Sequence, residues 1–255
     1  MLVIGGYDVA SIPEIGYGHQ RGGIKRWLSQ RTMRSATCLI TNSEYSRSEV
    51  ARNVGLTNGK VRAIYHGVPD PFGELPRGPR KRLALTVGNV DSSTLRRKGH
   101  EDFVRAAALM PDVEFVLAGA GRDETFDYLR KIATPNVRLT GRLSDEALND
   151  LYRDASVYVQ ASRHEGFGLS VAEAMLAGCV PVVTRAGALP EVTGGEGIFV
   201  DSSEPAVLAE AITTAITWSD DRRAGIRQRI LDRFPMEARG ERVAELLRPL
   251  MNGSD

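Results

Sequence analysis

The sequence predicts an α/β protein with a parallel sheet covered by helices on both faces. From residue 82 onward, short apolar segments alternate with segments of helical pattern. One of them, residues 113–118, is almost continuously apolar, as expected for a strand buried on both faces. The hydrophobic and charged contents, 42% and 25%, are those of a globular domain, and a net charge of +1 gives no global field for nucleic acid.

The first part of the chain predicts a smaller unit of the same kind. Strands are expected at residues 1–6, 36–42 and 61–65, with a glycine-rich loop after the first. A helix is expected to start within residues 43–46, capped by Ser43, Ser46 or a nearby acidic residue, and to run to about residue 54 and stop at Gly55. Four prolines within residues 69–81 then indicate a linker.

Residues 20–34 form a basic segment of helical pattern. Arginines and lysines alternate there with apolar residues, and the next acidic residue is Glu44. Such a segment either contacts anionic lipid or an acidic acceptor, or is a solvated helix face. The charges do not fall cleanly on one side, which favours the solvated face.

The second part of the chain predicts six strands and a series of helices. Strands are expected at residues 83–88, 113–118, 137–140, 157–159, 180–183 and 197–201. Residues 89–98 read as a polar loop, and helices are expected at residues 99–110, 123–132, 144–154, 171–177, 205–217, 220–233 and 236–250.

The functional pattern lies in residues 161–181, ASRHEGFGLSVAEAMLAGCVP. Gly166 and Gly168 interrupt the strand pattern, and a helical pattern follows that ends at Gly178. The first N–H groups of such a helix have no intrahelical partner and favour a phosphate. Glu165 precedes this turn and Glu173 lies within the helix, and carboxylates are good acceptors for sugar hydroxyls. A ligand with hydroxyls on both sides of a phosphate is predicted, which describes a nucleotide sugar.

This pattern resembles the two-glutamate signature of retaining glycosyltransferases of family 4, which have the GT-B fold of two Rossmann-like domains. The resemblance implies that Glu165 contacts the donor sugar and that Glu173 holds the ribose hydroxyls. It implies further that the turn between them meets the diphosphate. The residues of that turn are Gly166, Phe167, Gly168 and Leu169.

A second match to the family lies in the loop that follows the strand at residues 83–88. There the family has Gly-Arg, a spacer and Lys-Gly, and here Gly88 and Lys98 match while Asn89 stands at the arginine position. Lys98 is therefore predicted to be catalytic, by neutralising the leaving diphosphate. Asn89 leaves one cationic contact open, which Arg96 or Arg97 supplies unless both are merely solvated.

Two smaller matches complete the predicted donor site. Arg142 and Leu143 belong to a Thr-Gly-x-Leu segment whose backbone meets the nucleobase in the family. Arg142 either stacks on the base or is an exposed arginine at a strand end. His164 either donates a hydrogen bond to a sugar or phosphate oxygen or is a neutral turn residue.

The resemblance also implies a domain organisation. Residues 42–46 and 66–68 match the family's pattern at the end of its first domain, so residues 1–68 are interpreted as the remnant of an N-terminal, acceptor-side Rossmann-like domain. Residues 69–81 are the linker, and residues 82–235 form the C-terminal nucleotide-sugar-binding domain. Residues 236–255 are expected to form a helix that packs back on the N-terminal part.

The implied activity is transfer of a sugar from a UDP-, GDP- or ADP-sugar, with retention, to a hydroxyl of a glycan, lipid or small molecule. No metal or other cofactor is expected, because no aspartate-rich metal motif is present. With the acceptor-side domain reduced, one alternative is a non-catalytic nucleotide-sugar-binding subunit, or a fragment that needs an N-terminal domain from a partner chain. A nucleotide-sugar epimerase of the same fold is another.

The cysteines and the apolar runs of the sequence indicate in which compartment the protein is expected. Cys38 and Cys179 lie in apolar runs, which favours buried thiols over a disulfide or a metal site. The N-terminus has no signal pattern and no run of about 18 apolar residues occurs, so a cytoplasmic location, with possible contact to the inner membrane surface, is expected.

Overall fold

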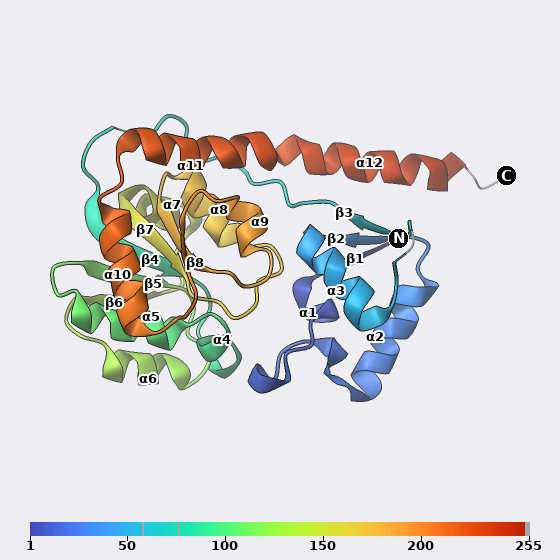
Figure 1. Ribbon diagram of the computed structural model, residues 1–255, viewed down its shortest axis with the longest axis horizontal. Coiled ribbons are helices and arrows are strands. Elements are labelled where there is room, and N and C mark those ends of the chain that lie inside the picture. Colours follow the sequence, from blue (N-terminus) through green and yellow to red (C-terminus); the bar gives the residue numbers. More distant parts are fainter. Residues whose placement is uncertain (58, 76, 253–255) are drawn as a thin grey trace. The chain divides into compact units, whose positions relative to one another are not determined.

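The computed structural model describes residues 1–57, 59–75 and 77–252, with side chains through residue 248. Pro76 of the predicted linker and residues 253–255 lie outside the described residues. The chain forms two compact units (Figure 1). Unit 1 consists of residues 1–69 together with the chain from Leu231 onward, and unit 2 is the segment Asp70–Ile230.

Unit 2 is built on a parallel sheet with the strand order β6-β5-β4-β7-β8-β9 over the described residues. The strands are β4 (Lys81–Val87), β5 (Glu114–Ala118), β6 (Val137–Gly141), β7 (Ala155–Gln160), β8 (Val180–Thr184) and β9 (Ile198–Val200). Phe115, Val116 and Leu117 of β5 are each 0% exposed, which confirms the prediction of a strand buried on both faces.

Helices cover both faces of this sheet, as the sequence predicts (Figure 1). One group packs on one face: α5 (His100–Ala106), followed by a 3₁₀ turn (Ala107–Leu109), α6 (Thr125–Ile132) and α10 (Pro205–Ile216). The other face carries α7 (Asp145–Asp154), α8 (Leu169–Leu176) and α9 (Leu189–Thr193). The chain then continues through α11 (Asp220–Arg233), within which it passes from unit 2 to unit 1.

Unit 1 has a smaller parallel sheet of order β1-β2-β3, formed by β1 (Leu2–Ile4), β2 (Leu39–Thr41) and β3 (Val61–Ala63). Its helices are α1 (Gly6–Val9), two 3₁₀ turns (Pro13–Ile15 and His19–Arg21), α2 (Gly23–Ser35) and α3 (Glu44–Val54). Ser43, one of the predicted capping residues, caps α3, because its hydroxyl accepts a hydrogen bond from the Ser46 N–H at 3.0 Å.

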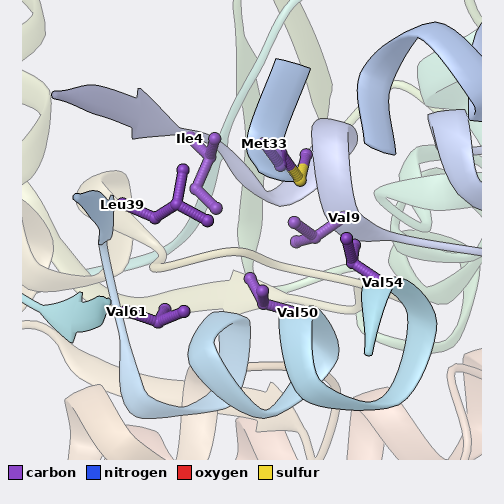
Figure 2. Packing of buried hydrophobic residues seen from close by; sticks show 7 residues of the cluster. All are labelled: Ile4, Val9, Met33, Leu39, Val50, Val54 and Val61. Carbon is purple, nitrogen blue, oxygen red and sulfur yellow. The ribbon is translucent and has the colours of Figure 1, made fainter. Parts of the chain in front are cut away.

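The core of unit 1 is a cluster of short aliphatic side chains (Figure 2). Figure 2 shows these side chains pointing toward one another from the strands and from all three helices: Ile4, Val9, Met33, Leu39, Val50, Val54 and Val61. Two elements of this cluster, β1 and β3, are edges of the sheet over the described residues.

The last helix, α12 (Met236–Asn252), belongs to unit 1. The Arg239 guanidinium donates to the carbonyls of Ile64 and Tyr65 at 2.9 and 3.0 Å. Just before the helix, the Phe234 carbonyl accepts from the Val68 N–H at 3.0 Å. These bonds fasten the chain that follows β3 to the C-terminal helix.

At the amino-terminal edge of the large sheet, buried arginines bind backbone carbonyls. Arg223 of α11, 6% exposed, donates to the carbonyls of Ser156 in β7 and of Gly178 just before β8 at 2.8 and 3.1 Å. Arg80 donates to the Ala155 carbonyl at 3.0 Å from the segment that precedes β4. These guanidinium groups satisfy carbonyls that would otherwise be buried without donors.

Three expectations about local structure need correction. Residues 89–98 are not simply a loop, because α4 (Ser92–Arg97) lies within them. The helix expected at residues 99–110 ends as α5 at Ala106 and tightens into the 3₁₀ turn. Cys179 is buried, but Cys38 is only half-buried because it lies between α2 and β2, outside the strand.

Among the described residues, no helix combines the length and the apolar character that crossing a membrane requires.

We expect Arg223→Ala to destabilise unit 2 by about 2 kcal/mol, because it leaves buried carbonyls without their donor. Urea unfolding followed by circular dichroism measures this loss. The matched control is Arg222→Ala, which removes a neighbouring guanidinium that stacks on the Trp218 ring instead. Equal unfolding midpoints for the two variants would contradict the role given to Arg223.

Candidate functional site

The order of the strands places the candidate site. From β4 the chain proceeds to β5 and β6 on one side, then returns to β7 on the other side of β4 and proceeds outward to β8 and β9. The order therefore reverses between β4 and β7, and in open parallel sheets ligands bind at the carboxyl ends of the strands at such a point. The segments that follow these two strands contain most of the predicted site residues.

The segment after β4 is shaped by a helix cap. The Asp91 carboxylate accepts from the N–H groups of Ser93 and Thr94 at 3.0 and 2.9 Å. In return, the Thr94 hydroxyl oxygen accepts from the Asp91 N–H at 2.9 Å. This reciprocal cap starts α4 within a stretch of polar residues, and it explains why the composition alone suggests a loop. Lys98 follows directly as the C-cap residue of α4.

The segments after β4 and β7 are joined through their backbones. The Arg163 N–H donates to the Arg97 carbonyl at 2.8 Å. Gly99 adopts a φ of 68°, and a Cβ at this position would lie 2.4 Å from the Ala161 carbonyl oxygen. Only glycine fits this left-handed conformation at such a close approach. The position of Lys98 is thus fixed relative to the turn that carries Glu165.

The structure brings Lys98 and Glu165 together. Lys98 Nζ lies 3.7 Å from Glu165 Oε2, and the two side chains are 16% and 18% exposed. This distance is that of an ion pair without a direct hydrogen bond, so the ammonium protons are not committed to the carboxylate. Gln160 Nε2 also approaches Glu165 Oε2, at 3.5 Å, and donates to the Ser162 hydroxyl at 2.7 Å.

Glu165 is held from the opposite side by the segment before α9. The Ala188 N–H donates to the Glu165 carbonyl at 2.9 Å. Gly187, at a φ of 64°, lies so close that a Cβ would be 2.0 Å from that carbonyl oxygen. The turn then continues through Phe167, which is buried in the core, to Gly168, the N-cap of α8. The first N–H groups of α8 thus begin three residues after Glu165.

Glu173 lies four residues into α8 and is not brought to Lys98 by any contact in the described residues. Its Oε2 accepts a hydrogen bond from the Tyr152 hydroxyl at 3.0 Å. Burial raises the pKa of Glu173, and the hydrogen bond from Tyr152 partly opposes that rise. Tyr152 is itself 1% exposed, so one oxygen of Glu173 is oriented from within the core.

His100, the first residue of α5, is buried beside Lys98. It is 0% exposed, and neither ring nitrogen has a hydrogen-bond partner among the described residues. Burial lowers the pKa of His100 to about 3, and the positive charges of Lys98 and Arg97 act in the same direction. The imidazole is therefore neutral at pH 7 and adds no charge beneath the Lys98 side chain.

A pocket of about 460 Å³ opens at the carboxyl ends of β4, β5 and β6. It contains three of the predicted residues, Asn89, Arg142 and Leu143. The remaining lining is partly apolar and partly cationic: Val87, Ala118, Gly119, Ala120, Arg122 and Leu148. Apolar walls with two guanidinium groups suit a flat heteroaromatic ring that is attached to an anionic chain.

The other predicted residues lie around these groups. Gly88 directly follows β4 and lies against the Lys98 side chain, and Arg97 is half-buried at the end of α4. His164 is buried in the turn, at 1% exposure, whereas Leu169 at the start of α8 is 41% exposed. Gly166 completes the turn next to Glu165.

Several residues of the site carry no signal in the sequence that singles them out. Tyr152 and Gln160 belong to an amphipathic helix and an apolar strand, where they read as ordinary structural positions. His100 is part of a helix start, and Arg122 lies in a glycine-rich turn. The spacing of the strands offers one clue, because any residue just after a parallel strand reaches the same edge of the sheet.

Comparisons with known proteins first define the class. Sucrose-phosphate synthase from Thermosynechococcus elongatus superposes with a TM-score of 0.77 at 26% identity, over 94% of this chain and 65% of that one. HepE from Anabaena, in complex with UDP-glucose, gives a TM-score of 0.78 at 20% identity, over 95% and 71% of the two chains. The fold is of the GT-B type, as predicted.

The sequence then gives the family. The model of the family "Glycosyl transferases group 1" matches residues 81–217, which is more than half of the chain, and the chain belongs to this family. O-antigen chain mannosyltransferase B of Escherichia coli is 28% identical over 192 residues, which are 67% of this chain and 49% of that protein. The chain thus spans about half the length of the curated relatives it matches.

We expect the free energy of unfolding to fall by about 2 kcal/mol between pH 7 and pH 5 because of His100. The unfolded histidine binds a proton below pH 6.5. The folded one does so only near pH 3, so stability is lost as the pH falls through this window. Urea unfolding at both pH values should show a loss that is larger in the parent than in His100→Phe by about 2 kcal/mol. His66, whose pKa burial also lowers, is present in both proteins and cancels. An identical pH dependence would contradict a buried neutral His100.

Proposed function

We propose that the protein binds a nucleoside-diphosphate sugar in unit 2 and that it takes part in transferring the sugar to an acceptor hydroxyl, with retention at the anomeric carbon. The observation that carries the proposal is the Lys98–Glu165 ion pair at the reversal of the strand order, next to the start of α8. A cation, a carboxylate and a helix N-terminus at one place suit a ligand with both phosphate and hydroxyl groups.

The binding mode follows from the arrangement of the site. The base enters the pocket between Asn89, Arg142 and Leu143. The ribose hydroxyls donate to Glu173, whose carboxylate is oriented by Tyr152. The diphosphate lies against Lys98 and the first N–H groups of α8, and the sugar hydroxyls donate to Glu165.

Asn89 stands where the family has an arginine that contacts the donor phosphates. Several nearby arginines could supply that positive charge instead. Arg122 and Arg142 line the same pocket as Asn89. Arg97 lies one residue before Lys98, whereas Arg96 is exposed. We propose that Arg122 shares this role with Arg97, because Arg122 lines the same pocket as Asn89 and its N–H donates to the carbonyl of the neighbouring Val90 at 2.9 Å.

In the proposed reaction, the bond between the anomeric carbon and the diphosphate oxygen breaks, and a bond to the acceptor oxygen forms on the same face of the sugar. The departing diphosphate receives the acceptor's proton. Lys98 and the N-terminus of α8 stabilise the negative charge that develops on the diphosphate. Glu165 orients the sugar and stabilises the positive charge that develops on its ring.

The relatives support the transferase reading by their names. The Escherichia coli protein is named as a mannosyltransferase, and a Mycolicibacterium hassiacum relative, 28% identical over 185 residues, is named as an MMP alpha-(1->4)-mannosyltransferase. HepE was solved with UDP-glucose. Sugar transfer from a nucleotide donor is thus the activity we propose.

A second candidate is a nucleotide-sugar-binding subunit that requires an acceptor-side domain from a partner chain. One observation favours it: every residue of the proposed donor site belongs to unit 2, while unit 1 has a three-stranded sheet over its described residues. Transfer by the 255-residue chain alone would decide against it. A nucleotide-sugar epimerase, the third reading, would release a free nucleotide and an altered sugar without any acceptor.

We expect Lys98→Ala to weaken binding of nucleoside diphosphates by at least about tenfold, because it removes a charge-assisted contact to the phosphates. Calorimetric titration of UDP, GDP and ADP with the parent first identifies the nucleotide to use. Lys131→Ala, an exposed lysine on α6, is the matched control and should bind like the parent. If Lys98→Ala bound the nucleotide as tightly as the parent, the phosphate role of Lys98 would be wrong.

We expect Glu173→Gln to weaken nucleoside diphosphate binding by about tenfold while leaving inorganic pyrophosphate binding unchanged, because the carboxylate contacts the ribose and not the phosphates. Lys98→Ala should weaken both ligands. The same calorimetric titrations compare the two variants. A Glu173→Gln protein with parental nucleotide affinity would remove Glu173 from the site without affecting the assignment of Lys98.

A further inference from the structure

Helix α2 of unit 1 presents an apolar stripe to solvent. Ile24, Trp27 and Leu28 are 73%, 58% and 50% exposed. With Arg31 they recur at the spacing that places side chains on one face of a helix. Exposed apolar residues are ordinary when scattered, but a contiguous set that includes a tryptophan marks an interaction site.

The carboxyl-terminal half of α2 is the part that is fixed to the unit. Met33 points into the aliphatic cluster (Figure 2). Gln30 donates to the Asn53 carbonyl at 3.0 Å, and Arg34 donates to the Val54 carbonyl at 2.9 Å. These contacts determine the rotation of the helix about its axis. They fix the carboxyl-terminal half of α2 to the unit, whereas residues 21–28 are all exposed, Ile24, Trp27 and Leu28 among them.

The surroundings of this stripe are cationic. No acidic residue occurs between Glu14 and Glu44, and this interval contains Arg21, Lys25, Arg26, Arg31, Arg34. The Arg31 guanidinium lies over the Trp27 ring, 5.6 Å from its centroid. The acidic group near α2, Asp8, already accepts from the Gly5 N–H at 2.8 Å and lies 3.6 Å from His19. The exposed apolar side chains of α2 are thus accompanied by positively charged ones.

The apolar surface continues beside the helix. A pocket of about 380 Å³ between α2 and β1 is lined by apolar side chains, among them Leu2, Val3, Leu28 and Met33. Its charged and polar lining residues are Asp8, His19, Lys25, Ser29 and Thr32. Val3, on the edge strand β1, is 50% exposed. The stripe and this pocket form one continuous patch on unit 1.

We infer that α2 docks on an anionic phospholipid surface, with Ile24, Trp27 and Leu28 at the boundary between headgroups and acyl chains. Lys25 and Arg31 then contact lipid phosphates. A helix with this combination lies in the plane of the interface, and each basic residue near an anionic bilayer adds about 1 kcal/mol of attraction. This inference departs from the solvated helix face that the charge pattern alone favours. The inference does not rest on the proposed transferase function.

The two tryptophans of the chain allow a direct test with the full protein. In Trp218→Phe, Trp27 is the sole reporter, and its fluorescence should shift to the blue with vesicles of phosphatidylcholine and phosphatidylglycerol, but not with phosphatidylcholine alone. In Trp27→Phe, the remaining Trp218 should show no shift. Sodium chloride should reverse the Trp27 shift.

Vesicle co-sedimentation gives the second measurement. We expect Arg31→Glu and Trp27→Ser each to weaken binding to the anionic vesicles by about tenfold or more. The matched control is Arg222→Glu, because Arg222 also lies over a tryptophan ring, that of Trp218, but directly follows Asp220 and Asp221. Circular dichroism confirms that each variant is folded.

Three results would overturn the inference: no binding to anionic vesicles, equal binding to neutral ones, or parental binding by both α2 variants. Light scattering in the absence of lipid tests the alternative that this face binds another protein molecule. If the parent self-associates through this face, and the α2 variants abolish that association while vesicles have no effect, the patch is a protein interface.

Discussion

The architecture of unit 2 depends on its parallel sheet, in which the strand order reverses between β4 and β7. All carboxyl ends of the strands reach one edge, and the segments that leave β4 and β7 diverge to opposite faces. The two edges of the sheet are finished in different ways. At the amino ends, Arg80 and Arg223 satisfy the chain's own carbonyls. At the carboxyl ends, Lys98 and Glu165 remain partly exposed and approach each other without a hydrogen bond.

Much of this unit could be predicted from its sequence, because strand and helix patterns alternate clearly and glycines mark the turn between Glu165 and Glu173. The proximity of Lys98 to Glu165 follows from both residues lying after parallel strands. The order of the strands could not be predicted, because spacing along the chain does not say on which side of β4 the strand β7 pairs. Helix α4 could not be predicted either, because the Asp91–Thr94 cap that starts it consists of residue types that are typical of loops.

Unit 1 shows a different limit of sequence patterns. The apolar periodicity of α2 predicts a stripe but not its direction, because a periodic face packs inward only if the rest of the unit offers a surface to cover. Here Met33 is the buried anchor, and the polar groups of Gln30 and Arg34 bind the neighbouring helix α3. A core made of short aliphatic residues leaves little room for a tryptophan, so Trp27 lies outside it.

The backbone contact between Gly99 and Ala161 has a consequence for how the site could change over time. It ties Lys98 to the turn of Glu165, whereas Arg142, Leu143 and Leu148 come from later segments of the chain and line a pocket that the Lys98 segment borders through Asn89. Under the proposed function, these three residues recognise the base and Lys98 contacts the phosphate. Substitutions in the pocket could then redirect the chain to a different nucleotide while the geometry around the phosphate is inherited unchanged.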